Sequence, residues 1–151
     1  MQNVRLVVKQ IKEVYDTPAA EVIKDLMANT VKIDPSRVDD VIMGCTFLEA
    51  SQGLNMARNI ALHAYLPNSV SGMTVNRFCS SGLQIIALAT ERVVVGAVDI
   101  IVAVGVESMS MIPLGGMSLQ PNPELMDTSP KIYISMGLTA ENIAAKYKIS
   151  R

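Results

Sequence analysis

The sequence is poor in several residue types on which particular classes of protein depend. It has two cysteines and one histidine, and two cysteines in 151 residues do not make a disulfide framework. No apolar stretch approaches the length of a membrane span. The first residues, Met1 to Arg5, lack the apolar core of a signal peptide. These absences predict a protein of a reducing, cytoplasmic compartment.

Charge is scarce as well. Only 18% of the residues are charged and the net charge is −1, so no general attraction to nucleic acid or to anionic lipid is expected. Basic and aromatic residues do not interleave as they do in single-strand binders. The sequence has no metal-ligand spacing, no Walker loop and no Gly-x-Gly-x-x-Gly motif. We therefore expect no metal, no bound cofactor, and neither nucleic acid nor membrane as a partner.

Apolar residues make up 50% of the chain, which favours elements buried on more than one side. Their periodicity predicts strands at 4–8, 38–45, 70–75 and 99–104, and helices at 17–29, 54–66, 83–95 and 137–147. Strands that alternate with helices indicate an α/β fold with a mostly parallel, mixed sheet covered by helices. The helix at 83–95 is apolar nearly all round and is predicted to be buried on most sides.

The composition changes after Ser110. Residues 111–130 are rich in Met, Pro, Gly and Asn and have no clear periodicity, which predicts an extended loop or an inserted subdomain. We therefore expect an α/β domain over residues 1–110 and a separate segment over residues 111–151.

Cys79 follows the apolar strand at 70–75 and precedes Ser80, Ser81 and a long apolar helix. Backbone N–H groups at a helix N-terminus favour a thiolate and can hold a developing oxyanion. Ser80 and Ser81 are expected to cap these N–H groups. The residues alone leave two readings of Cys79 equally open, a nucleophile or a buried, inert cysteine.

Three runs of residues carry a family resemblance. They are residues 76–84, Asn-Arg-Phe-Cys-Ser-Ser-Gly-Leu-Gln, residues 104–110, Val-Gly-Val-Glu-Ser-Met-Ser, and residues 135–142, Ser-Met-Gly-Leu-Thr-Ala-Glu-Asn. In this order they resemble segments of the thiolases, the acetyl-CoA acyltransferases. The resemblance covers the chain from Val38 to its end and, less closely, residues 19–37. It implies the first half of a duplicated, five-layered α-β-α-β-α fold, followed by the start of an inserted loop domain.

The resemblance also implies chemistry. In thiolases the cysteine that matches Cys79 attacks 3-ketoacyl-CoA or acetyl-CoA and becomes acylated, and CoA or a second acetyl-CoA then takes the acyl group. Coenzyme A is thus a substrate, and the setting is fatty-acid β-oxidation or acetoacetyl-CoA metabolism. The family forms homodimers or homotetramers through the half that bears this cysteine.

Three readings of function remain. Thiolases take their activating histidine from a Gly-His-Pro motif and their acid–base cysteine from a Cys-x-Gly motif, and neither motif is present here. The chain is therefore expected to be the N-terminal portion of a thiolase, acylated slowly and unable to turn over alone. The alternatives are a truncated module that only binds acyl-CoA or dimerises, and a condensing enzyme that resembles the ketoacyl synthases.

Three further residues complete the candidate site. Arg77 and Glu107 are expected to form a buried ion pair that braces the cysteine loop, because each follows a strand and the two strands are expected to be neighbours. Two separate solvated charges are the alternative. Met136 matches a methionine that lines the acyl pocket, although packing within a loop would also explain it.

The remaining candidates are interpreted structurally. Cys45 ends an apolar strand and is expected to fill the core. His63, the one histidine, is expected on a helix surface rather than in a dyad with Cys79. Ile85 and Val104 stand where thiolases usually have smaller residues, so crowding near the cysteine loop is expected.

Overall fold

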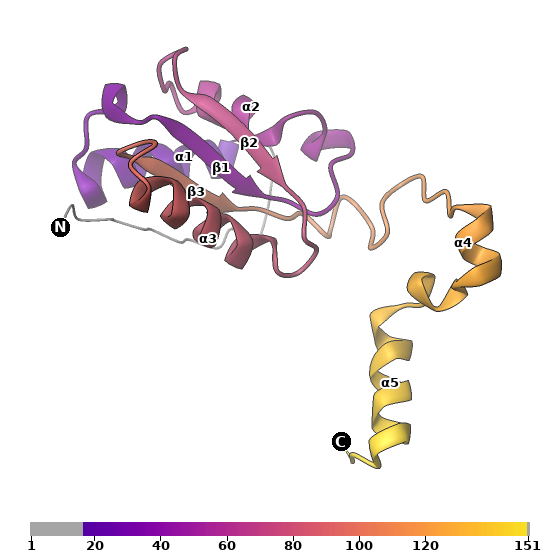
Figure 1. The fold of residues 1–151 in the computed structure, drawn as a ribbon. Coiled ribbons are helices and arrows are strands. Elements are labelled where there is room, and N and C mark those ends of the chain that lie inside the picture. The colour runs from indigo at the N-terminus through magenta and orange to yellow at the C-terminus, as the bar shows by residue number, and fades with distance from the viewer. Residues whose placement is uncertain (1–16, 151) are drawn as a thin grey trace. The chain divides into compact units, whose positions relative to one another are not determined.

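The computed structural model describes residues 17–150 (Figure 1). This part of the chain divides into two compact units, one that ends at Met117 and one that begins at Ser118. The strand expected at 4–8 lies outside the described residues.

The first unit is built on three parallel strands. β1 (Asp40–Gly44) lies in the centre, between β2 (Ser71–Val75) and β3 (Ile101–Gly105). Every residue of β1 is buried, as expected for the central strand of a sheet covered on both faces. The predicted α/β fold is confirmed, and within the described residues all strand pairs are parallel.

Helices cover both faces of this sheet (Figure 1). The other elements of the unit are α1 (Thr17–Asp25), a π-helical turn (Leu26–Val31), 3-10 turns at Pro35–Arg37 and Ala50–Gln52, α2 (Met56–His63) and α3 (Ser81–Val94). The chain moves from β1 outward to β2 through α2, and back past β1 to β3 through α3. Right-handed crossovers in opposite directions place α2 and α3 on opposite faces.

Alternate side chains of β1 therefore join different cores. Val41 and Met43 pack in a cluster with residues of α1 and α2, whereas Ile42 packs with Ile85 and Ala89 of α3. Ile85 is buried in this cluster beside Ala89 and Ala103, Val104 is buried in the other cluster, and the crowding expected at these two positions stays a prediction.

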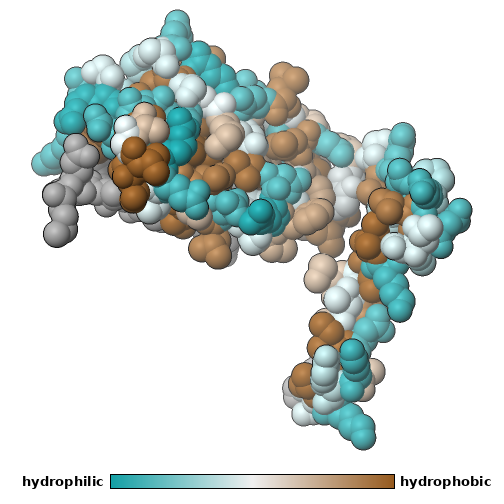
Figure 2. Space-filling view, viewed as in Figure 1, coloured by the Kyte–Doolittle hydropathy of each residue, from teal (hydrophilic) through white to brown (hydrophobic). Residues whose placement is uncertain are grey.

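The burial predicted for the apolar helix is wrong for the chain as it stands. α3 buries Ser81, Ile85 and Ala89 against the sheet, while Leu83 is 72% exposed and Val94 is 74% exposed. A helix on a three-stranded sheet presents only one face to it, so apolar residues on the other faces remain uncovered. Figure 2 shows apolar side chains scattered among polar ones on the visible surface of this unit.

The second unit contains α4 (Pro123–Thr128), a 3-10 turn (Pro130–Tyr133) and α5 (Met136–Tyr147). The sequence predicted α5 and missed α4. Asn122 caps α4 by accepting a hydrogen bond from the Leu125 N–H, with Pro123 in the first turn. That capping signal was present in the sequence, but six residues are too few to give a periodicity. None of the helices in residues 17–150 has the length and apolarity needed to cross a bilayer.

Gly44 lets α3 approach the sheet closely. A Cβ atom at this position would lie 2.9 Å from the carbonyl carbon of Ser81 and 3.1 Å from its Cβ. At the opposite end of β1, Arg92 of α3 pairs with the buried carboxylate of Asp40. The two contacts fix the helix at both ends of the central strand.

We predict that Gly44→Ala destabilises the chain by about 1–3 kcal/mol, because the new methyl group meets the backbone of α3. Gly105→Ala is the matched control, since Gly105 pairs with Gly44 in the sheet and an added Cβ there meets no described atom within 4 Å. Urea unfolding of both variants measures the difference. Equal free energies of unfolding would contradict the close contact.

Candidate active site

The carboxyl ends of the three parallel strands meet at one edge of the sheet. Thr46 follows β1, Asn76 follows β2 and Val106 follows β3. Ligand sites of parallel α/β sheets lie at this edge, outside the carboxyl ends of the strands. The segments that follow the strands therefore contain the candidate active site.

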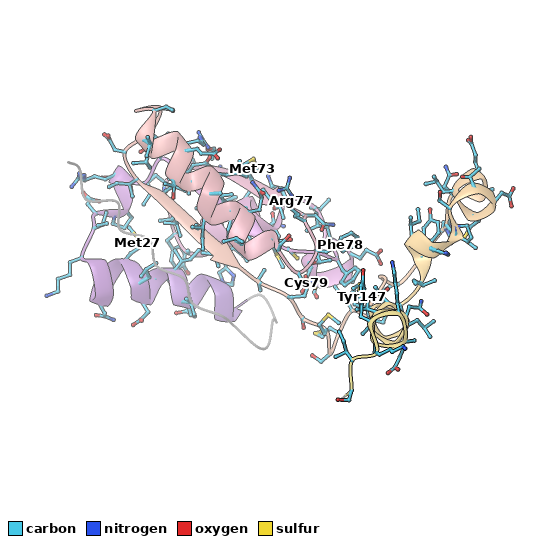
Figure 3. All side chains as sticks on the ribbon, turned by 60° about the horizontal axis from the view of Figure 1, so that its bottom comes forward. Met27, Met73, Arg77, Phe78, Cys79 and Tyr147 are labelled. Carbon is cyan, nitrogen blue, oxygen red and sulfur yellow. The ribbon has the colours of Figure 1, made fainter. Side chains whose placement is uncertain are left out.

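Cys79 lies in the turn that joins β2 to α3, as the sequence predicted, and its side chain is exposed. Figure 3 shows Arg77, Phe78 and Cys79 together at the N-terminal end of α3. Phe78 has a φ of +48°, in the left-handed region, and its side chain is 69% exposed. A bulky residue in this conformation is strained and persists only where its surroundings hold it. The exposure of Cys79 fits a reactive thiol better than an inert one.

The two serines act within this turn. The Ser81 hydroxyl oxygen accepts a hydrogen bond from the Arg77 N–H at 2.8 Å and donates to the Phe78 carbonyl at 2.6 Å. The Ser80 hydroxyl donates to the Arg77 carbonyl at 2.8 Å. The capping predicted for the helix is wrong, because these hydroxyls bind the backbone of the turn instead, and Ser80 makes no side-chain bond to the helix.

Asn76 was missed by the sequence analysis. Its side-chain oxygen accepts a hydrogen bond from the Phe78 N–H at 3.0 Å, and its Nδ2 donates to the Thr46 carbonyl at 2.8 Å. An asparagine that binds the N–H two residues later is a common turn-forming arrangement, and this signal could have identified the first bond. The second bond joins residues 30 positions apart and has no local signal.

Arg77 and Glu107 do not form the predicted ion pair. Arg77 donates instead to the side-chain oxygen of Gln84 in α3. Glu107 accepts from the Thr46 N–H at 2.6 Å and from Gln52 Nε2 at 2.7 Å. The pairing assumed that β2 and β3 are neighbours, but β1 lies between them. The roles of Arg77 and Glu107 as supports of the cysteine loop stay predictions.

Gln52 is a further polar residue of this edge that the sequence did not reveal. It is fully buried, and its Nε2 donates to both the Glu107 carboxylate and the Phe47 carbonyl, while its Oε1 accepts from the Ser108 N–H. Buried polar side chains are stable when they are fully hydrogen-bonded. Gln52 thus ties the segment after β1 to the segment after β3.

Two other candidates take no part in this hydrogen-bond network among residues 17–150. His63 is exposed at the end of α2, and no hydrogen bond among residues 17–150 joins it to Cys79. Met136 belongs to the second unit, at the start of α5, and is 66% exposed. Its role in an acyl pocket stays a prediction. Over the same residues, no group of three His, Cys, Asp or Glu side chains is placed to hold a metal ion.

The two cysteines differ in environment. Cys45 is 1% exposed, and burial, together with the negative charge of Glu107, raises the pKa of its thiol from 9.0 to about 12. It packs in the core on the α1 and α2 side of the sheet, as the sequence predicted. Cys79 is the exposed thiol of the pair.

Comparison with known proteins identifies a family. A family model described as "Thiolase, N-terminal domain" matches residues 12–151. A 3-ketoacyl-CoA thiolase of Bacillus subtilis (strain 168) is 54% identical over 114 residues, which is 76% of this chain and 29% of the relative. Another, from Saccharophagus degradans, is 38% identical over 136 residues, covering 90% of this chain and 34% of the relative. The chain therefore spans about a third of the length of these curated relatives.

The raised pKa of Cys45 predicts a loss of stability at alkaline pH. Above pH 9.0 the unfolded chain loses the Cys45 proton while the folded chain keeps it until about pH 12, so the free energy of unfolding falls across this range. The slope reaches at most about 1.4 kcal/mol per pH unit. Urea unfolding below and above pH 9.0 should give a smaller decrease for Cys45→Ala than for the parent. Cys79→Ala is the control, and equal decreases in parent and Cys45→Ala would contradict the prediction.

Glu107→Gln is expected to lower the free energy of unfolding by about 1–3 kcal/mol. The carboxylate accepts two hydrogen bonds, and the amide of glutamine would turn a donor toward one of those donors. Glu91→Gln, at an exposed position of α3, serves as the control for the change of charge. Equal free energies of unfolding of the two variants in urea would show that the hydrogen bonds of Glu107 do not stabilise the fold.

Proposed function

The chain belongs to the thiolase family, and from this premise we propose that Cys79 is the nucleophile of a thiolase-type acyl transfer. The chain would act as the N-terminal part of a longer protein, as its coverage of the relatives suggests. The observation that carries the proposal is the exposed thiol of Cys79 in a turn between a parallel strand and a helix N-terminus. The substrates are 3-ketoacyl-CoA or acetyl-CoA, with CoA as the acceptor.

The chemistry is acyl transfer to a thiol. The carbonyl that is attacked is the thioester of acetyl-CoA or the 3-keto group of 3-ketoacyl-CoA. The thiolate of Cys79 attacks the carbonyl carbon, and a new S–C bond forms. With acetyl-CoA the bond from that carbon to the sulfur of CoA breaks, and CoA leaves as a thiolate that takes up a proton. With 3-ketoacyl-CoA a C–C bond breaks, and the departing acetyl-CoA carbanion is protonated. A thiolate suits this transfer because it is both nucleophile and leaving group.

This chain supplies the nucleophile and its surroundings. In this turn Cys79 is exposed at the carboxyl edge of the sheet, next to the first backbone N–H groups of α3. Proton transfer in the complete reaction would come from the histidine and second cysteine of the second half, by the family resemblance. We also propose that Met136 lines the acyl pocket. We further propose that the protein forms homodimers or homotetramers and that it is a cytoplasmic enzyme of fatty-acid metabolism.

A non-catalytic module is the second candidate. It is favoured by one observation, that His63 is exposed and makes no hydrogen bond to Cys79 within the described residues. A cysteine without a base reacts more slowly, since only its ionised fraction attacks. The family match favours a thiolase-derived chain over a condensing enzyme of the ketoacyl-synthase kind.

We predict that acetyl-CoA transfers one acetyl group to the chain and that Cys79→Ala abolishes the transfer. Intact mass spectrometry after incubation with acetyl-CoA measures the adduct. The matched control is Cys45→Ala, which removes the other thiol and should leave the adduct unchanged, because Cys45 is buried and protonated at neutral pH.

Alkylation with iodoacetamide completes the test. A parent chain in which Cys79 is alkylated but never acetylated would overturn the proposed acyl transfer and favour the non-catalytic module. An adduct that persists in Cys79→Ala would assign the chemistry to another residue.

A further inference from the structure

We propose that Asn76 is the positioning residue for Cys79, because its side chain fastens the cysteine turn to the segment that follows the central strand. The inference rests on the proposed acyl transfer at Cys79. Asn76 does not touch the reacting thioester in this proposal. It acts through Phe78, the residue before the nucleophile.

The backbone conformation of this turn must be held by hydrogen bonds. Phe78 has a φ of +48° without being a glycine, and its exposed ring gives it little packing that could hold this conformation. Relaxation of Phe78 to a common backbone conformation would redirect the next residue, which is Cys79. The direction of the thiol therefore depends on the hydrogen bonds that hold the backbone of Phe78. Ser81 binds its carbonyl from within the turn, and Asn76 binds its N–H.

The Asn76 side chain binds the Phe78 N–H with its oxygen and the segment after β1 with its amide nitrogen. Its Oδ1 accepts from the Phe78 N–H at 3.0 Å, while its Nδ2 donates to the Thr46 carbonyl at 2.8 Å. Among the hydrogen bonds of residues 17–150, this is the one that links the side chains or backbone of residues 76–80 to the segment after β1. The serines and Arg77 bind only within the turn or to α3.

The anchor at Thr46 is itself held. Its N–H donates to the Glu107 carboxylate at 2.6 Å, and Glu107 also accepts from the buried Gln52. A path of hydrogen bonds thus runs from the segment after β3, through the segment after β1, to the turn after β2. Asn76 is the last side chain of this path before the nucleophile.

The test compares three variants of the chain. Asn76→Ala removes both bonds. Asn76→Asp keeps an oxygen for the Phe78 N–H and removes only the donor to Thr46, so the turn itself is preserved. Asn55→Ala is the matched control. Asn55 also bridges two segments, donating to the Gly72 carbonyl and accepting from the Arg58 N–H and the Thr74 hydroxyl, but it makes no hydrogen bond to residues 76–80.

For each variant, the rate of Cys79 acetylation by acetyl-CoA is measured against pH, and the rate of alkylation by iodoacetamide is measured beside it. Acyl transfer needs an oriented thiol, whereas the small alkylating reagent needs only an accessible one. We expect both Asn76 variants to lower the plateau rate of acetylation by at least about tenfold. We expect alkylation to change by less than about twofold, and Asn55→Ala to behave as the parent does.

If Asn76→Asp is acetylated at the same plateau rate as the parent, the hydrogen bond from Asn76 to Thr46 does not position Cys79. An equal loss in Asn55→Ala, or parallel losses of acetylation and alkylation, would reduce Asn76 to a general structural role. Amide hydrogen exchange separates this inference from the proposed function. If the parent is not acetylated, the proposed acyl transfer is wrong. Faster exchange of the Phe78 N–H in Asn76→Ala, and not in Asn55→Ala, would still show that Asn76 holds the turn.

Discussion

The close contact between Gly44 and Ser81 is the constraint on which the rest of the site depends. It brings the first turn of α3 against the carboxyl end of the central strand, at a distance that no side chain on Gly44 would allow. The ion pair of Arg92 with Asp40 holds the other end of the helix. Since Cys79 lies two residues before α3, this packing constrains where the proposed nucleophile lies.

The two cysteines show how position in the fold sets the environment of one chemical group. Cys45 follows the central strand inside the core, where low polarity and the nearby charge of Glu107 disfavour the thiolate. Cys79 follows an outer strand in an exposed turn, beside a helix N-terminus. One thiol therefore contributes to packing, while the other is exposed to solvent.

The polar residues of the carboxyl edge form a single connected arrangement rather than separate pairs. Glu107 and Gln52 join the segments after β3 and β1, and Asn76 extends this connection to the turn after β2. The central position of β1 fits the pattern, since β1 lies between the two outer strands and the segment after it is bound from both sides. Arg77 instead binds α3 through Gln84.

The sequence by itself determined the alternation of strands and helices, the strand-to-helix turn at Cys79, the core position of Cys45 and the family. Each follows from the periodicity or the order of residues close together in the chain. Only the tertiary structure decided that Glu107 binds Thr46 rather than Arg77, that Asn76 binds Thr46, and that α3 keeps an exposed apolar face. The two hydrogen-bond outcomes depend on which strand lies in the centre of the sheet, and the exposed face of α3 depends on how much of the helix the sheet covers. Both are set by residues far apart in the chain, for which local patterns carry no information.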